Sequence, residues 1–347
     1  MAVLASMVEG VLVVDERNRV VVINAAAAQL LRCDASKAAG KPLVELVRLP
    51  SLQRFVDATL QSAASREDEV IIDDGGRRHL QLHGSRLADP AGQGSTAVVV
   101  LHDVTRLRRL ETVRREFVAN VSHELKTPIT SVQGFLDTLR DGAVDDPATA
   151  RRFVEIAGRQ ADRLGAIIED LLTLSRLEEA SGGLSSTVQT RPLAPTLKAA
   201  IQICQHKADA KGIALSLDCP PDLTARFDPA LLEQALINLI DNAVKYSPEN
   251  TRVGIGGTAA GGAAEISVAD EGCGIEAQHL PRLFERFYRV DKARSRNLGG
   301  TGLGLAIVKH IAQVHGATVT VNSEPGRGTV FVFRLPPLET KPEEFPS

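Results

Sequence analysis

The sequence predicts a multidomain α+β protein with a mixed α/β module, a long two-helix hairpin and a C-terminal α/β sandwich. Three changes of hydrophobic pattern along the 347 residues predict this order. Short apolar runs separated by turn-forming residues fill residues 1–104, and apolar residues at helical spacing follow over 105–180. Residues 188–337 mix helical segments with short apolar runs, and 338–347 form a polar tail. This length allows two or three domains with substantial cores.

Composition and charge narrow the class of protein. The formal net charge is −3 with a pI near 6.3 and no basic domain, which argues against nucleic acid as a direct partner. The four cysteines are widely spaced without metal-type pairing, as in proteins of a reducing compartment. No run of about 18 uncharged apolar residues is present, and the N-terminus lacks a basic-then-apolar signal segment. The sequence therefore predicts no membrane span in this chain.

The N-terminal module, residues 1–104, reads as strands and helices in alternation. An alanine-rich helix ending at Leu31 and polar helices over 35–63 separate two early strands from three later ones. Hairpin signals at 73–76 and 89–94 separate the later strands. The expected strands are 10–15, 20–24, 70–73, 80–85 and 96–103.

Residues 105–180 predict a helical hairpin. One helix is expected to run to about Arg140, and Asp146 and Pro147 are expected to cap and start the second helix. A single hairpin leaves its apolar stripe half exposed, so two copies are expected to close a four-helix bundle as a homodimer. Packing of the stripe against flanking domains in a monomer is the alternative. The stripe comprises Val118, Val121, Leu125, Val132, Phe135 and Leu139 on the first helix, and Phe153, Ile156, Leu164, Ile167, Leu171 and Leu174 on the second.

The segment Phe117–Ile129 places His123 on the first helix of the hairpin, with Glu124 beside it. His123 lies off the apolar stripe, and Thr127 follows one turn later. Pro128 cannot donate to the carbonyl of Glu124, so a kink is expected beside the histidine. An exposed imidazole next to an acid is poised to react, although a lone helical histidine is most often an ordinary surface residue.

The C-terminal part follows a polar linker at 181–186 and predicts an α+β sandwich with one helical layer. Helices are expected at 193–211, 229–246, 280–288 and 303–315. Strands are expected at 213–218, 224–227, 252–257, 264–270, 317–323 and 329–335.

Four further motifs lie downstream of His123. They are Asn238–Ser247, Asp270–Ile275, Leu283–Arg289 and Gly299–Leu305. Together with the His123 segment they closely resemble the H, N, G1, F and G2 boxes of bacterial two-component sensor histidine kinases, in the family's order over about residues 105–337. The resemblance implies a protein histidine kinase, a phosphotransferase, whose domain at 188–337 has the ATP-binding fold shared with gyrase-type and chaperone ATPases.

Residues 1–104 resemble a PAS sensor domain, and Asp103–Thr105 is similar to the usual exit of that fold into a helix. There is no flavin-attachment cysteine motif. His79 and His83 alternate with leucines on an expected strand, which favours solvent-facing histidines over haem ligands. Whether this domain binds a ligand or only dimerises stays open. The direct junction of PAS and H box resembles the phosphate-regulon sensor kinases of the same family.

Asn238, Asn242 and Lys245 share one face of the helix expected at 229–246. Asn242 offers a neutral oxygen to Mg²⁺, Lys245 a point charge to phosphate, and Tyr246 is expected to line the pocket. Related ATPases place a glutamate at the position of Asn238, and a neutral amide cannot activate water as a base. The site is therefore expected to hold ATP and Mg²⁺ without hydrolysing the nucleotide.

Two glycine series are expected to complete the ATP site. Asp270 can accept a hydrogen bond from the adenine amino group, while the glycines after it let backbone amides approach closely. A tight turn is the alternative for this segment. The second series precedes an apolar helix whose N-terminus can cradle phosphate. The predicted ATP-binding residues are Asn238, Asn242, Lys245, Tyr246, Asp270, Gly272, Gly274, Gly300, Gly302, Leu303 and Gly304.

The segment between the two glycine series is a candidate lid. Phe284 and Phe287 are expected to pin it to the core. The resemblance favours Arg289 as the residue that faces the transferring phosphate, with Arg286 and Lys292 as alternatives. Arginine suits the charge that develops on a phosphoryl group in the transition state.

The expected chemistry is transfer of a phosphoryl group to an unprotonated nitrogen of His123. Glu124 can accept the proton of the other ring nitrogen and stabilise the cation that forms. The labile P–N bond suits onward transfer to an aspartate of a response-regulator receiver domain. Thr127 resembles the residue that positions water for dephosphorylating that partner, which predicts a phosphatase activity. The alternative is a hydroxyl bonded back to its own helix.

Two other function classes compete with a PAS-containing sensor kinase in signal transduction. One is an ATPase of the gyrase or chaperone type, against which Asn238 and the His123 hairpin count. The other is a catalytically silent PAS scaffold. Membrane-bound members of the resembled family carry their spans upstream of such a region, so the chain is expected to be cytoplasmic, either alone or as part of an inner-membrane sensor. The signal, the regulator, and phosphorylation within or between protomers stay open.

Overall fold

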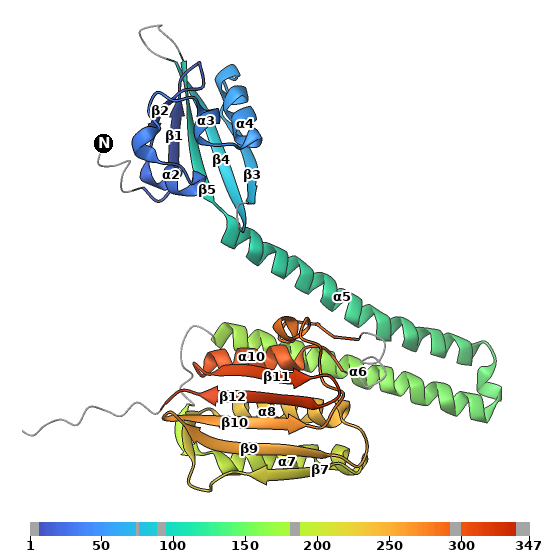
Figure 1. The fold of residues 1–347 in the computed structure, drawn as a ribbon. Helices are drawn as coiled ribbons and strands as arrows, with labels where there is room; N and C mark the ends of the chain where they lie inside the picture. Colours follow the sequence, from blue (N-terminus) through green and yellow to red (C-terminus); the bar gives the residue numbers. More distant parts are fainter. Residues whose placement is uncertain (1–6, 74–75, 89–94, 181–187, 292–299, 338–347) are drawn as a thin grey trace, which may run out of the picture. The chain divides into compact units, whose positions relative to one another are not determined.

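The computed structural model describes residues 7–73, 76–88, 95–180, 188–291 and 300–337. The chain divides into two compact units, Met1–Val118 and Ala119–Ser347. Each unit is built around its own sheet, as Figure 1 shows. Within the described residues, no helix combines the length and apolar character needed to cross a bilayer.

The first unit contains a five-stranded antiparallel sheet in the order β2-β1-β5-β4-β3. Its strands are β1 (Gly10–Val14), β2 (Val20–Ile23), β3 (Arg66–Asp73), β4 (Arg77–Ala88) and β5 (Ser95–Asp103). The segments between β2 and β3 are α2 (Ala25–Leu31), η1 (Ala35–Lys37), α3 (Leu43–Leu46) and α4 (Pro50–Gln61). The five strands expected from the sequence are therefore present.

Alternation along β4 decides which side chains enter the core of the first unit. Leu80 and Leu82 are each 1% exposed, whereas His83 on the other face is exposed. His79 also lies on that outer face and contacts the carboxylate of Glu69. The expectation that both histidines lie outside the core is confirmed.

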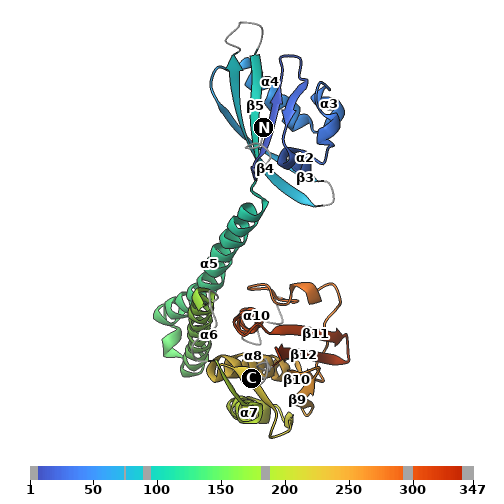
Figure 2. The same ribbon diagram turned by 90° about the vertical axis from the view of Figure 1, so that its left-hand side faces the viewer.

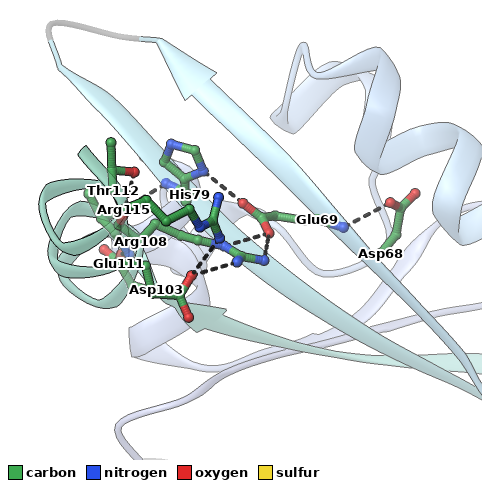
Figure 3. Close-up of polar contacts among 9 residues, drawn as sticks. Asp68, Glu69, His79, Asp103, Arg108, Glu111, Thr112 and Arg115 are labelled. Carbon is green, nitrogen blue, oxygen red and sulfur yellow. Dashed lines mark hydrogen bonds and ion pairs between the residues drawn. The ribbon is translucent and has the colours of Figure 1, made fainter. Parts of the chain in front are cut away.

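Glu69 on β3 joins this sheet to the first turns of α5 (Thr105–Arg140) (Figure 3). Its Oε1 lies 2.7 Å from Nδ1 of His79 on β4, and its Oε2 accepts hydrogen bonds from Nε of Arg108 at 2.9 Å and from Nη2. Glu111, on the next turn, accepts from Nη1 of Arg108 at 2.9 Å. The hydrogen bonds from Arg108 and then His79 lower the pKa of Glu69. An ionised carboxylate therefore fixes the start of the helix.

The helical hairpin of the second unit consists of α5 from Ala119 onward and α6 (Pro147–Ala180). The turn between them contains η2 (Ala143–Asp145). Asp146 caps α6 as predicted, because its Oδ1 accepts from the backbone N–H of Ala148 at 3.2 Å. Proline at the first helical position completes this start signal.

Helix α5 continues through Pro128, whose side chain is buried, so the expected kink does not break the helix. Near the turn, the rings of Phe135 and Phe153 lie 5.3 Å apart and join the two helices. Large apolar side chains nevertheless stay exposed along the hairpin within one chain. They include Ile129, Leu136, Val154, Ile168 and Leu172.

The rest of the second unit has a five-stranded sheet in the order β11-β12-β10-β9-β7, with helices α7, α8 and α10 on one face (Figure 2). The pairs are antiparallel except β7 with β9. The strands are β7 (Ala214–Asp218), β9 (Arg252–Ala260), β10 (Ala263–Asp270), β11 (Thr318–Glu324) and β12 (Gly328–Leu335). The helices are α7 (Leu193–Asp209), α8 (Pro229–Tyr246) and α10 (Gly304–Val314), and β6 (Gln189–Pro192) pairs with β8 (Thr224–Phe227).

The α+β fold class with one helical layer is confirmed, but two details differ from the expectation. The helix expected at 280–288 is only the short η3 (Leu280–Arg282). Phe287 has φ +61°, a left-handed conformation that a right-handed helix cannot include. Strand β6 was not expected, because all four of its side chains are exposed and no apolar alternation marks it.

His315 ties the end of α10 to the start of α8. The side chain is buried, its Nδ1 donates to the carbonyl of Ile311 at 2.7 Å, and its Nε2 accepts from the backbone N–H of Asp228 at 2.9 Å. Asp228 in turn caps α8 through the N–H of Ala230 at 2.9 Å. Burial lowers the pKa of His315, against smaller opposing effects of Ile311 and Asp228. A neutral imidazole therefore sits at the junction of two helices.

This burial predicts a pH-dependent stability. Because the pKa of His315 is lower in the folded protein than its unfolded value of about 6.5, its contribution is complete above pH ~6.5 and declines as the pH falls toward the folded pKa. In His315→Gln, the melting temperature is expected to fall less steeply below neutrality. At higher pH the variant is expected to be less stable by roughly 1–3 kcal/mol, because the flexible glutamine amide does not reproduce both imidazole hydrogen bonds, to Ile311 and from Asp228.

Thermal melts of wild type and His315→Gln over a pH series check this expectation, with His206→Gln as a control at an exposed position. Parallel pH profiles for wild type and His315→Gln would contradict it.

Candidate functional site

A cavity of about 490 Å³ lies between α8, the loop after β10, the loop before α10, and α6. It brings together most of the residues predicted to bind ATP. Two do not line it, Gly272 and Leu303, and the side chain of Leu303 is buried in the core. The predicted residues that line it are Asn238, Asn242, Lys245, Tyr246, Asp270, Gly274, Gly300, Gly302 and Gly304.

Helix α8 forms one wall of the cavity because its two faces differ. Its apolar face is buried, with Leu236 and Leu239 at 0% and 1% exposure, and this fixes the polar face toward the cavity. The side-chain nitrogen Nδ2 of Asn238 is buried without a hydrogen-bond partner among the described residues. A buried amide of this kind fits an acceptor on a bound molecule, such as a phosphate oxygen or a metal-bound water.

Lys245, which the sequence predicts to supply a charge for phosphate, forms an ion pair in this structure. Its Nζ lies 2.6 Å from Oδ2 of Asp241, one turn earlier on α8, and Lys207 of α7 lies 2.5 Å from Oδ1. Burial acts to raise the pKa of Asp241, but the two lysines more than offset it and the net shift is downward. Asp241 is thus an ionised cavity residue that sequence reasoning missed, although it directly precedes Asn242.

Asp270 ends β10 at the other end of the cavity. Its Oδ1 accepts from the backbone N–H of Gly272 at 2.8 Å and of Thr329 at 3.1 Å. Burial raises the pKa of Asp270, and these two donors oppose the rise. Both contacts use the same oxygen, so the other oxygen can accept from a ligand amino group.

The glycines after Asp270 are needed by the protein itself. Gly274 has φ +68°, and a Cβ there would lie 2.0 Å from the carbonyl oxygen of Glu324. At Gly272 a Cβ would lie 2.9 Å from the carbonyl oxygen of Tyr246. Both positions therefore require glycine for the packing of neighbouring backbone, and Gly274 also lines the cavity.

The described part of the lid is held through the ring of Phe284 and the backbone of Phe287. The rings of Phe284 and Phe331 lie 6.3 Å apart at 84°, and the N–H of Phe287 donates to the carbonyl of Gly302 at 2.8 Å. Arg289 lines the cavity, with its side chain 6% exposed.

The two alternatives to Arg289 have different outcomes. Arg286 forms an ion pair with Glu178 of α6 and does not line the cavity. Lys292 lies outside the described residues.

His123 is exposed on α5, while its neighbour Glu124 is enclosed by cations. Nη2 of Arg163 on α6 donates to Oε2 of Glu124 at 2.8 Å, and Nη2 of Arg289 lies 4.0 Å from the same oxygen. The carboxylate beside His123 is therefore approached by an arginine of α6 and by an arginine that lines the cavity. The sequence did not indicate Arg163, because only the packing of α6 on α5 brings it to Glu124.

The hydroxyl of Thr127 donates to the carbonyl of His123 at 3.0 Å, one turn back on α5. This is the local bond that was the structural alternative for Thr127. While it donates to this carbonyl, the hydroxyl oxygen can still accept a hydrogen bond from a water molecule.

The residues of the cavity fit a magnesium nucleotide. Asn238 has an unsatisfied donor, Asn242 supplies a neutral oxygen, and the loop from Gly300 to Gly304 leads into the N-terminus of α10. In the described ranges no group of three or more His, Cys, Asp and Glu side chains could hold a metal ion. Mg²⁺ in nucleotide sites is usually held largely through phosphates and water.

Three family models match the chain. Residues 227–339 match the histidine kinase-, DNA gyrase B- and HSP90-like ATPases, residues 113–180 match the His Kinase A (phospho-acceptor) domain, and residues 2–104 match the PAS fold. Each match covers one of the segments whose motifs are described above.

Several curated proteins are similar to the chain. The phosphate regulon sensor protein PhoR of Pseudomonas aeruginosa is 34% identical over 98% of this chain and 74% of its own length. The sensor-like histidine kinase SenX3 of Mycobacterium tuberculosis is 42% identical over 76% of this chain, and the sensor histidine kinase WalK of Bacillus subtilis is 32% identical over 99%. The chain spans 63% of SenX3 and 56% of WalK.

Among solved structures, the histidine kinase ThkA in complex with the response regulator protein TrrA matches 99% of both chains. The TM-score is 0.52 and the identity is 22%. At this identity the likeness supports the fold.

The close approach at Gly274 predicts a large cost for a single methyl group. Gly274→Ala combines a strained left-handed backbone with overlap against Glu324, and is expected to destabilise the second unit by roughly 2–5 kcal/mol. Gly326→Ala, in the neighbouring turn, is the matched control because φ is +79° but no atom lies within 4 Å of the added Cβ. It is expected to cost about 1–2 kcal/mol. Denaturant unfolding of both variants checks the difference, and equal costs would contradict it.

Proposed function

The chain belongs to the family of PAS-containing two-component sensor histidine kinases, and we propose that it phosphorylates its own His123 from ATP bound with Mg²⁺ in the second-unit cavity. The observation that carries this proposal is the meeting of Arg289 and Glu124 at 4.0 Å. Arg289 lines the cavity, and Glu124 directly follows His123 on α5. The nucleotide site and the segment that carries the acceptor histidine therefore share a contact.

The proposed binding roles follow from the cavity walls. Asp270 holds the base through its second oxygen, Tyr246 lines the pocket beside it, and the loop from Gly300 to Gly304 holds the phosphates with the N-terminus of α10. Asn242 is the proposed Mg²⁺ ligand, and the free amide of Asn238 donates to a phosphate oxygen or a metal-bound water. When bound, the nucleotide supplies the γ-phosphoryl group.

The proposed transfer brings the imidazole of His123 to Glu124. The contacts of this carboxylate with Arg163 and Arg289 both use Oε2, so Oε1 can accept a hydrogen bond from the N–H of the histidine ring. Arg289 can then act on the charge of the transferring group rather than on Glu124. In this structure Glu124, the proposed proton acceptor, is hydrogen-bonded to Arg163.

Asn238 also bears on the competing ATPase function. Its side chain lines the cavity as a neutral amide, which cannot take a proton from water. Asp241, the acid next to Asn242, is paired with two lysines and is held ionised by them. These features support transfer to a protein side chain over hydrolysis.

The proposed downstream partner is the receiver domain of a response regulator, which takes the phosphoryl group on an aspartate. The complex of ThkA with the response regulator protein TrrA supports this choice of partner. The similarity to the phosphate regulon sensor protein PhoR supports a role in phosphate signalling. ATP as donor and a receiver domain as acceptor fit a cytoplasmic reaction.

We further propose a homodimer and the domain limits 1–104, 105–180 and 188–337. The exposed apolar side chains along the hairpin, among them Leu136 at 54% and Val154 at 60% exposure, support a second copy that completes a four-helix bundle. The matching His Kinase A (phospho-acceptor) domain covers this hairpin.

The primary test is labelling with γ-labelled ATP and Mg²⁺. Wild type is expected to retain label that survives base and is lost in acid, as a P–N bond does. His123→Gln is expected to retain none while binding nucleotide normally, and Asn242→Ala is expected to bind Mg-nucleotide about tenfold more weakly or worse. Catalytic release of free phosphate without labelled protein would instead favour the ATPase.

Thr127→Ala separates the two proposed activities. Because Thr127 is proposed to orient water only during dephosphorylation, autophosphorylation is expected to stay near the wild-type rate. Loss of a phosphoryl group from a phosphorylated receiver domain is expected to slow by about tenfold or more. Thr138→Ala is the control, since its hydroxyl makes the same local bond, to the carbonyl of Gly134 at 2.8 Å. Equal slowing of both activities would refute the assigned role.

A further inference from the structure

Asp170 of α6 is a residue of the helical hairpin that lines the nucleotide cavity. Its Oδ2 accepts a hydrogen bond from the hydroxyl of Thr301 at 2.6 Å. Thr301 lies between Gly300 and Gly302, in the loop proposed to hold the phosphates, and its Oγ1 also accepts from the N–H of Leu303 at 3.2 Å. A carboxylate from one helix therefore occupies the phosphate end of a pocket built mainly by the nucleotide-binding domain.

Among the described residues, Asp170 forms no direct ion pair. Lys245 lowers its pKa electrostatically but forms its close ion pair with Asp241. Burial raises the pKa of Asp170, while Thr301 and Lys245 lower it and Asp241 raises it. The carboxylate is held by a neutral hydroxyl in a half-buried site that it shares with another acid.

A triphosphate in this pocket conflicts with that arrangement. Its negative charge would be placed beside the carboxylate of Asp170, and like charges in a partly buried site repel strongly. The hydroxyl and amides around Thr301 are also the donors that a phosphate would recruit. The phosphates and Asp170 thus compete for the same loop.

A second contact between α6 and the nucleotide-binding domain lies outside the cavity. Glu178 pairs with Arg286 of the lid, and Nε2 of His310 on α10 lies 3.9 Å from its Oε1. None of these three side chains lines the cavity. Asp170 and Glu178 thus both connect α6 to the nucleotide-binding domain, and of these two only Asp170 lines the cavity.

We propose that the hydrogen bond between Asp170 and Thr301 is a latch that docks α6 on the nucleotide-binding domain and that nucleotide phosphates displace it. The inference rests on the proposed function, because it assumes a nucleotide in this cavity. Nucleotide binding thereby releases this contact of α6, and the coupling is reciprocal: a closed latch weakens nucleotide binding. Asp170 is a positioning residue in this scheme and does not touch His123.

The test measures the dissociation constant of a non-hydrolysable ATP analogue for the full chain by calorimetry, with and without Mg²⁺. It is run at a pH of about 8, well above the usual range for a carboxyl. Asp170→Asn keeps the side-chain shape and an acceptor for Thr301 but removes the charge. It is expected to bind the analogue about tenfold more tightly than wild type, with and without the metal. Glu169→Gln, the same charge change at the adjacent exposed residue, is expected to bind as wild type does.

A third variant separates charge from docking. Glu178→Gln weakens the contact of α6 with Arg286 without changing the charge of the cavity lining, and is expected to tighten binding less than Asp170→Asn. In hydrogen exchange, the segment of α6 around Asp170 is expected to exchange faster when wild type binds the analogue. The same segment in Asp170→Asn is expected to respond less.

Three outcomes would overturn the latch. Equal affinities of wild type and Asp170→Asn would show that the carboxylate does not oppose the phosphates. Weaker binding by Asp170→Asn only in the presence of Mg²⁺ would make Asp170 a metal ligand instead. Absence of analogue binding in every variant would refute the proposed function and the latch with it, whereas binding without any difference refutes the latch alone.

Discussion

Burial of one face of α8 sets the geometry of the second unit. Leu232, Leu236 and Ile240 are fully buried on the apolar face of this helix, and the N-terminal cap by Asp228 and the linked His315 fix where the helix begins. Because a helix presents its two faces in a fixed relation, burying one face turns the other toward the cavity. The asparagines, the lysine and Asp241 are positioned by hydrophobic packing that none of them contributes to. The orientation of the cavity side chains on α8 therefore depends on the hydrophobic core behind this helix.

Charge compensation dominates the polar part of the site. Asp241 has two lysines, Glu124 has Arg163 with Arg289 nearby, and Glu178 has Arg286. An ionised carboxylate that loses such a partner in a partly buried site is costly, so each movement in the catalytic cycle must exchange one partner for another. Asp170 differs from these three acids because its hydrogen-bonding partner is a hydroxyl, so an incoming anion that displaces it does not have to replace a close cation among the described residues.

The sequence predicted the local elements well and the cross-element contacts poorly. The apolar spacing and the Asp146–Pro147 start signal predicted α6, and alternation predicted that His79 and His83 lie outside the core, because each depends on neighbours in the chain. Arg163 and Asp170 were missed, since α6 reads as an amphipathic helix and only tertiary packing brings them to Glu124 and Thr301. The pairing of Lys245 with Asp241 was missed for a different reason. The two residues lie four positions apart on α8, and this spacing allows an ion pair but does not require one. The family resemblance named the box residues but not these partners.

The contact of Glu69 with Arg108 has a practical consequence for dividing the protein into fragments. The carboxylate on β3 is held by a guanidinium on α5, so the compact N-terminal unit extends to Val118, beyond the end of its last strand. A recombinant sensor piece ending at residue 104 would leave Glu69 without its arginine and would discard the helical residues that the sheet holds in place. A fragment that keeps the contact of Glu69 with Arg108 must end within α5. The N-terminal unit is therefore best produced together with the first turns of this helix.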